Sequence, residues 1–258
     1  MGDTTTAERV SSALQRFIAP GLRYSQALFE EQLEIHVRRA SRWLDLGCGH
    51  RVLSEWRAAA EETLVSQVPV AVGLDVDFDA IRRHRSFKHL CLGDIGTLPF
   101  KDASFDLVTA NMVVEHLHDP AIQFAEVARV LTPGGVFVFH TPNERSYVIA
   151  IARLIPERLK RTLAGWLEGR ASEDVYPTHY LANRPSTIES IATASGFTVD
   201  EIQFICSAPA LTPIPPLVIP ELLWIRQLQR RPSLAKYRTT LICVLRKNGG
   251  SAAAAAAD

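Results

Sequence analysis

The sequence predicts an α/β protein in which a parallel β-sheet is covered by helices on both faces. Short apolar runs recur along the chain, at 42–46, 70–74, 88–92, 106–110 and 136–141. They are apolar without alternation, which is typical of strands buried on both faces. Stretches with helical composition separate them, and this order favours a doubly wound parallel sheet. With 258 residues, 47% of them apolar, the chain can build one large domain, and a wholly disordered protein is excluded.

The helices of the first half are expected from apolar spacing and from their end signals. The fourth of them follows Pro120 and ends before Pro133-Gly134-Gly135. The expected helices are 25–40, 53–66, 78–85 and 120–131.

After Pro142 the pattern changes. Residues 146–168 hold two apolar helical stretches, and 186–195 is a further expected helix that stops at Gly196. Two last strands are expected at 197–206 and 238–246. The proline-rich run 208–224 between them is expected to be neither a regular helix nor a central strand.

These changes of pattern divide the chain into five parts. They are an N-terminal segment (1–24), a core (25–142), a helical insertion (143–185), the C-terminal part of the same sheet domain (186–247) and a low-complexity tail (248–258).

Charge and cysteine usage narrow the class of protein. Lys plus Arg is 28 and Asp plus Glu is 28, so a chain-wide footprint for nucleic acid is not expected. The four cysteines are far apart and form no CxxC, which disfavours a disulfide scaffold or structural zinc and fits a reducing cytoplasm. We expect no signal peptide. The sequence contains no uninterrupted run of about 18 apolar residues, so a membrane-spanning helix is not expected either.

A glycine turn and an acid indicate a nucleoside site. Gly47-Cys48-Gly49 follows the first strand, and Asp75 ends the second strand 26 residues after Gly49. In a doubly wound sheet these positions lie side by side, where a carboxylate can accept both hydroxyls of a ribose. An adenosine-containing ligand is therefore implied. A dinucleotide is disfavoured, because the sixth position counted from Gly47 is Val52 and not glycine.

Five ordered runs carry a resemblance to a known family. They are LDLGCG (44–49), VGLDVD (72–77), GDIGTLPFKDASFDLV (93–108), EHLHDP (115–120) and EVARVLTPGGVFVF (126–139). With them the chain resembles the class I S-adenosylmethionine-dependent methyltransferases, in the group that includes ubiquinone/menaquinone-type and many small-molecule enzymes. The resemblance implies a Rossmann-like seven-stranded sheet with the last strand antiparallel, a helical lid after strand five, S-adenosylmethionine as cofactor and S-adenosylhomocysteine as product.

The resemblance also assigns cofactor contacts. Asp45, Gly47, Cys48 and Gly49 match the loop that holds the methionine part. The other matched positions serve the nucleoside and the amine: Asp75 for the ribose hydroxyls, Val76 against the adenine, Asp94 and Ile95 for the adenine amine and a backbone contact, and Asn111 with Met112 near the methionine amine. One departure is Arg51, where the group often has a third glycine.

Candidates for the acceptor side lie at strand ends and in the insertion. His116, His179 and Tyr180 are candidate bases or acceptor-orienting residues. The alternatives are that His116 belongs to a structural element and that the nearby His118 caps the next helix. Side chains expected to contact the acceptor are Tyr24, His140, Asn143 and Tyr147, with packing or a backbone hydrogen bond as the alternative. We expect no metal, since no carboxylate cluster is visible near strands four and five.

The segment 145–170 mixes basic and apolar residues. It is interpreted either as a lid that meets an anionic or amphiphilic substrate or a membrane surface, or as a solvated basic face over a core-facing stripe. A monomer or a homodimer is expected.

The predicted reaction is methyl transfer to a small-molecule or sugar/lipid-linked metabolite, with oxygen favoured over nitrogen and carbon. One rival is a nicotinamide-dependent oxidoreductase, against which Asp94 and the absent pyrophosphate glycine argue. The other is a methyltransferase-like binding protein without catalysis, which the Arg51 departure favours.

Overall fold

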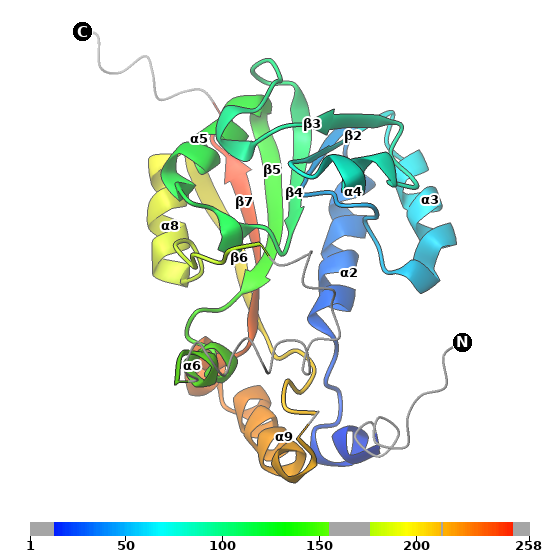
Figure 1. Ribbon diagram of the computed structural model, residues 1–258. Helices are drawn as coiled ribbons and strands as arrows, with labels where there is room; N and C mark the ends of the chain where they lie inside the picture. Colours follow the sequence, from blue (N-terminus) through cyan, green and yellow to red (C-terminus); the bar gives the residue numbers. More distant parts are fainter. Residues whose placement is uncertain (1–12, 155–175, 213, 250–258) are drawn as a thin grey trace, which may run out of the picture. The chain divides into compact units, whose positions relative to one another are not determined.

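The computed structural model describes residues 13–154, 176–212 and 214–249, and a seven-stranded sheet forms its centre (Figure 1). The strand order is β3-β2-β1-β4-β5-β7-β6. The first five strands pair in parallel, and β7 is antiparallel to β5. The predicted α/β sheet with an antiparallel last strand is confirmed. The strands are β1 (Arg42–Leu46), β2 (Val70–Asp75), β3 (His89–Leu92), β4 (Phe105–Asn111), β5 (Leu131–Pro142), β6 (Phe197–Ile205) and β7 (Thr240–Lys247).

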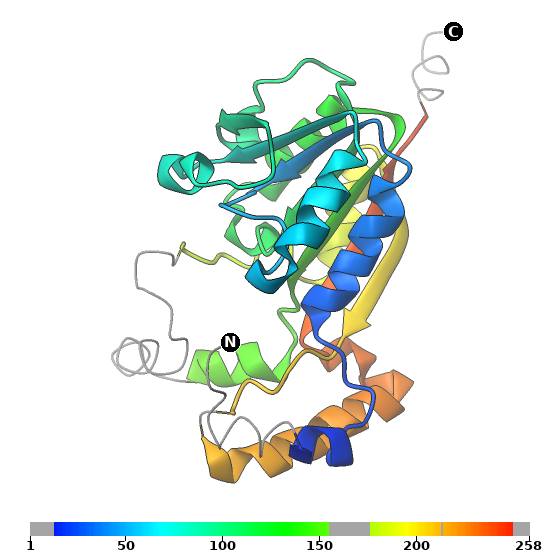
Figure 2. The same ribbon diagram turned by 90° about the vertical axis from the view of Figure 1, so that its right-hand side faces the viewer.

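Helices cover both faces of this sheet. Figures 1 and 2 show α2 and α3 on one face and α5 with α8 on the other. The strands between them are buried, and Leu44, Val108 and Val138 have no exposed surface. The helices are α2 (Ser25–Val37), α3 (Ala58–Ser66), α4 (Phe78–Arg82), α5 (Pro120–Val130) and α8 (Pro185–Ala194).

Helix α5 agrees with the expected helix 120–131, whereas strand β5 begins earlier than expected. Pro120 occupies its first turn, and the Asp119 carboxylate accepts the N–H of Ile122 as an N-cap. Strand β5, however, starts at Leu131, directly after the helix, and not at 136 as expected. Pro133-Gly134-Gly135 therefore lies inside the strand, where the pairing register with β4 shifts between Phe105 and Leu107. Such a bulge admits residues that a regular ladder rejects.

The proline-rich run contains a helix, contrary to expectation. Helix α9 (Pro215–Arg230) starts inside 208–224. Its first prolines occupy the first turn, where a missing N–H costs nothing, and only Pro220 lies in the helix interior. The expectation that 208–224 contains no regular helix is therefore wrong, because a proline in the first turn of a helix does not disrupt it.

Contacts divide the chain into two units. The sheet unit is Phe29–Thr141, Thr178–Gln203 and Ile242–Asp258, and the helical unit is Met1–Leu28, Pro142–Pro177 and Phe204–Leu241. The described helices of the helical unit are α6 (Tyr147–Leu154), α9 and the 3-10 helix η5 (Pro232–Tyr237). Part of the predicted helical insertion, 155–175, lies outside the described residues.

The helical unit has its own core and a buried acid. Val218, Leu222, Ile225 and Leu228 of α9 pack with Ile18, Ala19 and Cys206. The buried carboxylate of Glu221 accepts the Tyr147 hydroxyl at 2.7 Å and the N–H groups of Ala210 and Leu211 at 2.8 and 2.9 Å. These hydrogen bonds attach the segment before α9 to the helix. None of the described helices is both long and apolar enough to cross a membrane.

Candidate active site

The carboxyl ends of β1, β2, β3 and β4 lie at one edge of the sheet. The register pairs Leu46 with both Leu74 and Ala110, and Asp75 with Leu92. The residues that follow these ends are therefore neighbours. Strand order reverses between β1 and β4, which is where ligands bind in open parallel sheets.

The glycine turn is held against the end of β2. The N–H groups of Gly47 and Cys48 donate to the carbonyl of Leu74 at 2.8 and 3.1 Å. Gly47 has a φ of +64°, and a Cβ there would clash with Cγ2 of Val113. Glycine is required at this position both by the backbone conformation and by the lack of space.

Asp75 is joined directly to this turn. One carboxylate oxygen accepts the N–H of Gly49 at 2.8 Å, and the other accepts the N–H of Asp77 at 2.9 Å. The two bonds fix the plane of the carboxylate and leave lone pairs on both oxygens. The predicted neighbourhood of turn and acid is present.

Asp94 stands at the end of the next strand. The N–H of Gly93 donates to the carbonyl of Asp75 at 3.0 Å, which ties the two strand ends together. The Asp94 carboxylate accepts the N–H of Gly96 at 2.6 Å and caps the 3-10 helix η2 (Ile95–Thr97). Exposed apolar side chains belong to the same stretch of chain: Val76, Phe78 and Leu92. Two carboxylates and an apolar surface thus share this end of the sheet.

A cavity of about 180 Å³ opens beside the glycine turn. Asp45 and Asn111 contribute to its wall from β1 and β4. The remaining lining residues come from α2, the turn and the loop after it: Phe29, Gly47, Cys48, Gly49, His50, Arg51 and Val52.

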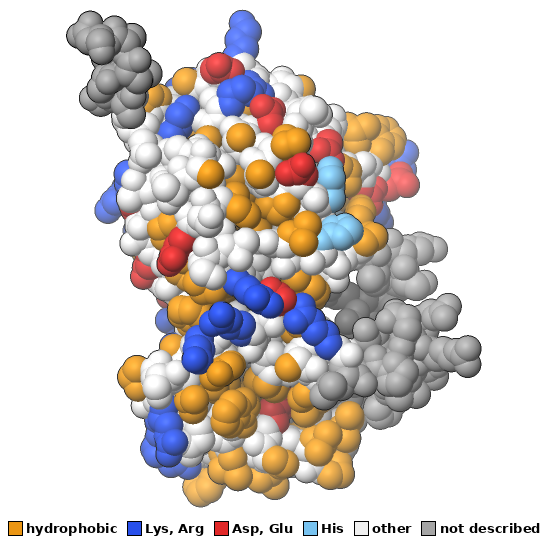
Figure 3. Space-filling model, turned by 90° about the vertical axis from the view of Figure 1, so that its left-hand side faces the viewer, with side chains coloured by type: hydrophobic (Ala, Val, Ile, Leu, Met, Phe, Trp, Pro, Cys, Tyr) orange, Lys and Arg blue, Asp and Glu red, His pale blue; other side chains and the backbone are white. Residues whose placement is uncertain are grey.

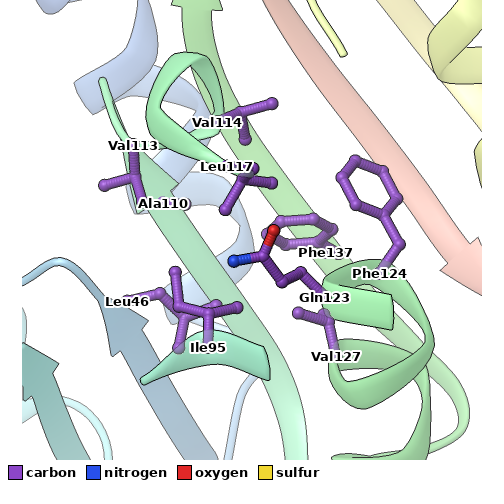
Figure 4. A pocket seen from close by; sticks show the side chains of 10 residues that line it. All are labelled: Leu46, Ile95, Ala110, Val113, Val114, Leu117, Gln123, Phe124, Val127 and Phe137. Atoms are coloured by element: carbon purple, nitrogen blue, oxygen red, sulfur yellow. The ribbon is translucent and has the colours of Figure 1, made fainter. Parts of the chain in front are cut away.

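Figure 4 shows a different and much smaller cavity, of about 10 Å³, between β4 and α5. Its lining is apolar apart from Gln123, and Ile95 contributes its side chain. This volume admits at most one water molecule, so it is a packing defect and not a ligand site.

The cavity wall continues into the segment after the glycine turn, where the sequence predicts a helix over 53–66, and here the structure differs. Helix α3 begins only at Ala58, after the 3-10 helix η1 (Glu55–Arg57), so no α-helix starts at the glycine turn. A buried acid holds the intervening loop instead. The Glu61 carboxylate accepts the N–H of Leu53 at 2.8 Å and pairs with Arg85, whose guanidinium also donates to the Leu53 carbonyl. The loop that carries Arg51 is thereby fixed in place.

Asp45 is the buried charge of the cavity. Its carboxylate accepts the Thr109 hydroxyl, which in turn accepts the Trp43 indole N–H at 2.7 Å. Burial is the main cause that raises the pKa of Asp45 to about 7; the Thr109 hydrogen bond opposes the rise, and the negative charges of Asp75 and Glu61 add to it. At neutral pH the group therefore exchanges between its neutral and its charged form.

Asn111 is supported by a buried histidine. The Nδ1 atom of His140 lies 2.9 Å from the Asn111 side-chain oxygen, and the imidazole stacks on Phe29, another wall residue. Burial lowers the pKa of His140 to about 4, so the ring is neutral at physiological pH. Its Nε2 atom has no hydrogen-bond partner among the described residues. Met112 follows in the left-handed region at φ 56°, with its N–H bonded to the His140 carbonyl.

The candidate bases form one cluster around Glu115. His116 ends the 3-10 helix η3 (Val114–His116), and the N–H groups of His179 and Tyr180 both donate to the Glu115 carbonyl, at 2.8 and 3.2 Å. Segments some sixty residues apart in the sequence thus meet. Tyr180 has a φ of 53°, an uncommon conformation for a non-glycine residue.

Three further residues of this cluster were not predicted from the sequence. The buried carboxylate of Glu115 accepts the Thr141 hydroxyl at 3.0 Å, and the Asn183 amide donates to the same hydroxyl at 2.6 Å. Burial raises the pKa of Glu115. An acid in an otherwise apolar turn, VVEHL, was the available signal.

Three predicted acceptor contacts belong to the helical unit. Asn143 is buried, and its amide donates to the carbonyls of Lys236 and Arg238 at 2.9 and 2.7 Å. Tyr147 bonds to Glu221, and Tyr24 is exposed. Asn143 and Tyr147 therefore hold their own unit together, and their contact with an acceptor stays a prediction. Among the described residues, no group of three or more His, Cys, Asp or Glu is placed to hold a metal ion.

Comparisons with known proteins agree with one another. The family model described as "Methyltransferase domain" matches residues 8–202. A malonyl-[acyl-carrier protein] O-methyltransferase of Erwinia billingiae is 34% identical over 119 residues, 45% of either chain. A demethylmenaquinone methyltransferase of Staphylococcus haemolyticus is 32% identical over 111 residues, 41% of this chain and 45% of the other. The chain thus spans less than half the length of these curated relatives.

Among solved structures, an S-adenosylmethionine-dependent methyltransferase from Mesorhizobium loti aligns with a TM-score of 0.52. Its identity is 20%, with 86% of this chain and 96% of the other covered, so the likeness shows the fold.

Replacing Asp45 by Asn should stabilise the protein at alkaline pH. Below pH 3.8, the ordinary pKa of the group, the carboxyl is neutral in both the folded and the unfolded protein. Between pH 3.8 and the folded pKa of about 7, it ionises in the unfolded protein alone. The wild type therefore loses stability as pH rises through this window, and Asp45→Asn does not. We expect the stability difference in favour of Asp45→Asn to grow by roughly 2–3 kcal/mol between pH 5 and pH 8 in urea unfolding.

The matched control is Asp79→Asn, an exposed acid on α4. Its stability difference from the wild type should be the same at both pH values. Equal curves for the wild type and Asp45→Asn would contradict the raised pKa.

Proposed function

The chain belongs to the methyltransferase domain family, as a class I S-adenosylmethionine-dependent methyltransferase, and we propose that it methylates an oxygen atom of a small-molecule or sugar/lipid-linked acceptor. The observation that carries the proposal is the hydrogen bond from Gly49 to Asp75, which joins the glycine turn to an acid able to hold a ribose.

The residues present fit a nucleoside. Each Asp75 oxygen accepts a single backbone N–H, so each can accept one ribose hydroxyl as well. In this proposal Asp94 accepts the adenine amine, Ile95 adds a backbone contact, and Val76 packs on the ring. The exposure of Val76 supports this role, because an apolar side chain in water gains from covering.

The cavity beside the turn fits the amino-acid end of the cofactor. We assign the ammonium group to Asp45 and the neighbouring backbone to Gly47, Cys48 and Gly49, with Asn111 and Met112 opposite. A buried carboxylate with a pKa near 7 is costly in the absence of a cation, and an ammonium group would offset that cost. In this proposal the cofactor lies close to the backbone of the glycine turn, and this turn requires glycine at position 47, where a Cβ would clash with Val113.

When bound, S-adenosylmethionine supplies a methyl group on a positively charged sulfur, which is a strong electrophile. The protein's residues have two tasks, to hold the acceptor in line with that methyl and to exclude water. We assign acceptor contact to the cluster of His116, His179 and Tyr180, with Glu115 holding its backbone together. His116 takes the acceptor proton, and His140 and Phe29 position Asn111.

An acceptor oxygen is favoured because a curated relative is named as an O-methyltransferase. The alternative function is binding of the cofactor without transfer. Arg51 favours it, since this residue lines the cavity where the family often has glycine. A nicotinamide-dependent oxidoreductase is less well supported, because Val52 occupies the third glycine position of the pyrophosphate turn.

Removal of either nucleoside acid should weaken cofactor binding. In calorimetric titration with S-adenosylhomocysteine, Asp75→Ala and Asp94→Ala should each lose about 30-fold in affinity, which corresponds to about 2 kcal/mol for hydrogen bonds to a charged group. The control Asp79→Ala should bind as the wild type does. Unchanged affinity in both variants, or binding of NADH in place of the nucleoside, would overturn the assignment.

Cofactor affinity should depend on pH through Asp45. Below about pH 7 the carboxyl holds a proton that must leave before it can accept an ammonium group, so the affinity for S-adenosylhomocysteine falls as pH decreases. The limit is about tenfold per pH unit. Asp45→Asn should bind more weakly and with no such slope between pH 5.5 and 7.5. A flat wild-type profile would remove Asp45 from the ammonium site.

Transfer is tested with labelled S-adenosylmethionine and a panel of carboxylic, phenolic and alcoholic acceptors. For an acceptor that is turned over, His116→Gln should reduce kcat by about 100-fold or more while cofactor affinity stays unchanged. His118→Gln, two residues further on and exposed, is the matched control and should retain activity. Tight cofactor binding with no turnover across the panel would favour the binding protein.

A further inference from the structure

Helix α9 carries apolar residues on both of its sides. Its inner side packs into the core of the helical unit through Val218, Leu222, Ile225 and Leu228. Its outer side is exposed and consists, over the first turns, of Pro216, Leu217, Ile219, Pro220, Leu223 and Trp224. Figure 3 shows hydrophobic side chains gathered on the surface of the helical unit, with Lys and Arg side chains beside them. Over its first turns the helix therefore exposes apolar side chains to water on the side that faces away from the core.

The polarity of this outer side changes along the helix axis. Beyond Trp224 the outward residues are Arg226, Gln227 and Arg230. The apolar stretch 216–224 is about 13 Å long at 1.5 Å per residue. A bilayer core is about 30 Å thick, so the stretch is too short to span it, whereas a helix lying in the plane of the interface can bury its outer side there. Tryptophan and arginine at its polar end are the residue types that lie at the level of lipid headgroups.

The described residues of the helical unit carry an excess of positive charge. Its described residues include nine basic side chains, Arg16, Arg23, Arg145, Arg153, Arg226, Arg230, Arg231, Lys236 and Arg238. The described acids of this unit are two, and both are engaged: Glu144 pairs with Arg153, and Glu221 is buried and hydrogen-bonded. The whole chain is neutral, so this excess is local.

We propose that the outer side of α9 docks the protein on the surface of an anionic lipid bilayer. Leu217, Ile219 and Leu223 enter the acyl region, Trp224 lies at the headgroups, and Arg226 and Arg230 contact lipid phosphates. Both requirements of a peripheral membrane helix, apolar area and positive charge, are met by the same element.

A second copy of this chain fits the surface less well. In a twofold dimer the same patch is used by both copies, so a single interface would collect two sets of Arg226, Arg230 and Arg231. Like charges at close range repel, whereas anionic headgroups attract all three.

The test is sedimentation of the full chain with phosphatidylcholine vesicles that contain about 30% phosphatidylglycerol, in about 0.1 M salt. We expect binding to these vesicles, at least about fivefold less to pure phosphatidylcholine, and a comparable loss in about 0.5 M salt, where charges are screened. Leu217→Ser/Leu223→Ser and Arg226→Gln/Arg230→Gln should each lose about fivefold or more. Their affinity for S-adenosylhomocysteine and their unfolding midpoints should equal those of the wild type.

Two exposed tryptophans supply a matched pair. Trp224 is 38% exposed on α9, and Trp56 is 86% exposed in the sheet unit. Vesicle binding should shift tryptophan emission to the blue in Trp56→Phe but not in Trp224→Phe. Three results would overturn the proposal. They are no sedimentation of the wild type with the anionic vesicles, a blue shift that is lost in Trp56→Phe as fully as in Trp224→Phe, and a wild-type dimer that the α9 variants convert to monomer. The last result would favour a second copy of the chain.

Discussion

A single hydrogen bond, from the Gly49 N–H to the Asp75 carboxylate, connects the glycine turn after β1 to the acid that ends β2, the two parts of the proposed nucleoside site. It exists because β1 and β2 are in parallel register, so that their ends arrive together and the carbonyl of Leu74 can hold Gly47 and Cys48. The bond also depends on the lack of a side chain at Gly47, since Val113 occupies the space that a Cβ would need. The geometry of this edge is therefore a consequence of sheet register and of one steric restriction.

Burial of Asp45 illustrates the conflict between stability and binding. A carboxylate enclosed by β1 and β4 destabilises the folded protein above the pH at which the unfolded chain ionises. Thr109 and Trp43 reduce this cost by hydrogen bonding without removing it. If a cation binds in the cavity as proposed, the free energy that burial of Asp45 costs the folded protein is recovered as affinity.

The sequence predicts the strands and the position of Asp75 and Asp94 at strand ends well because these depend on local patterns, whereas their role in binding a nucleoside stays a prediction. Asp75 and Asp94 each end an apolar run, and the topology of a parallel sheet places such ends together. Glu115 and Asn183 could not be found in this way, since their meeting at Thr141 joins segments far apart in the chain. Helix α9 was missed for a different reason. Its prolines are tolerated in the first turn, and a count of prolines carries no information about position within a helix.

Net charge is also a poor guide when charge is segregated. The formal net charge of the whole chain is zero, which gives no reason to expect an anionic partner. The described part of the helical unit, however, holds nine basic side chains and two acids. At physiological ionic strength the field of an exposed charge is screened within about 8 Å, so compensating acids further away than this do not cancel a local excess of positive charge. What a partner meets is the local excess together with the apolar residues beside it. The combination on α9 is thus more informative about binding than the composition of the whole chain.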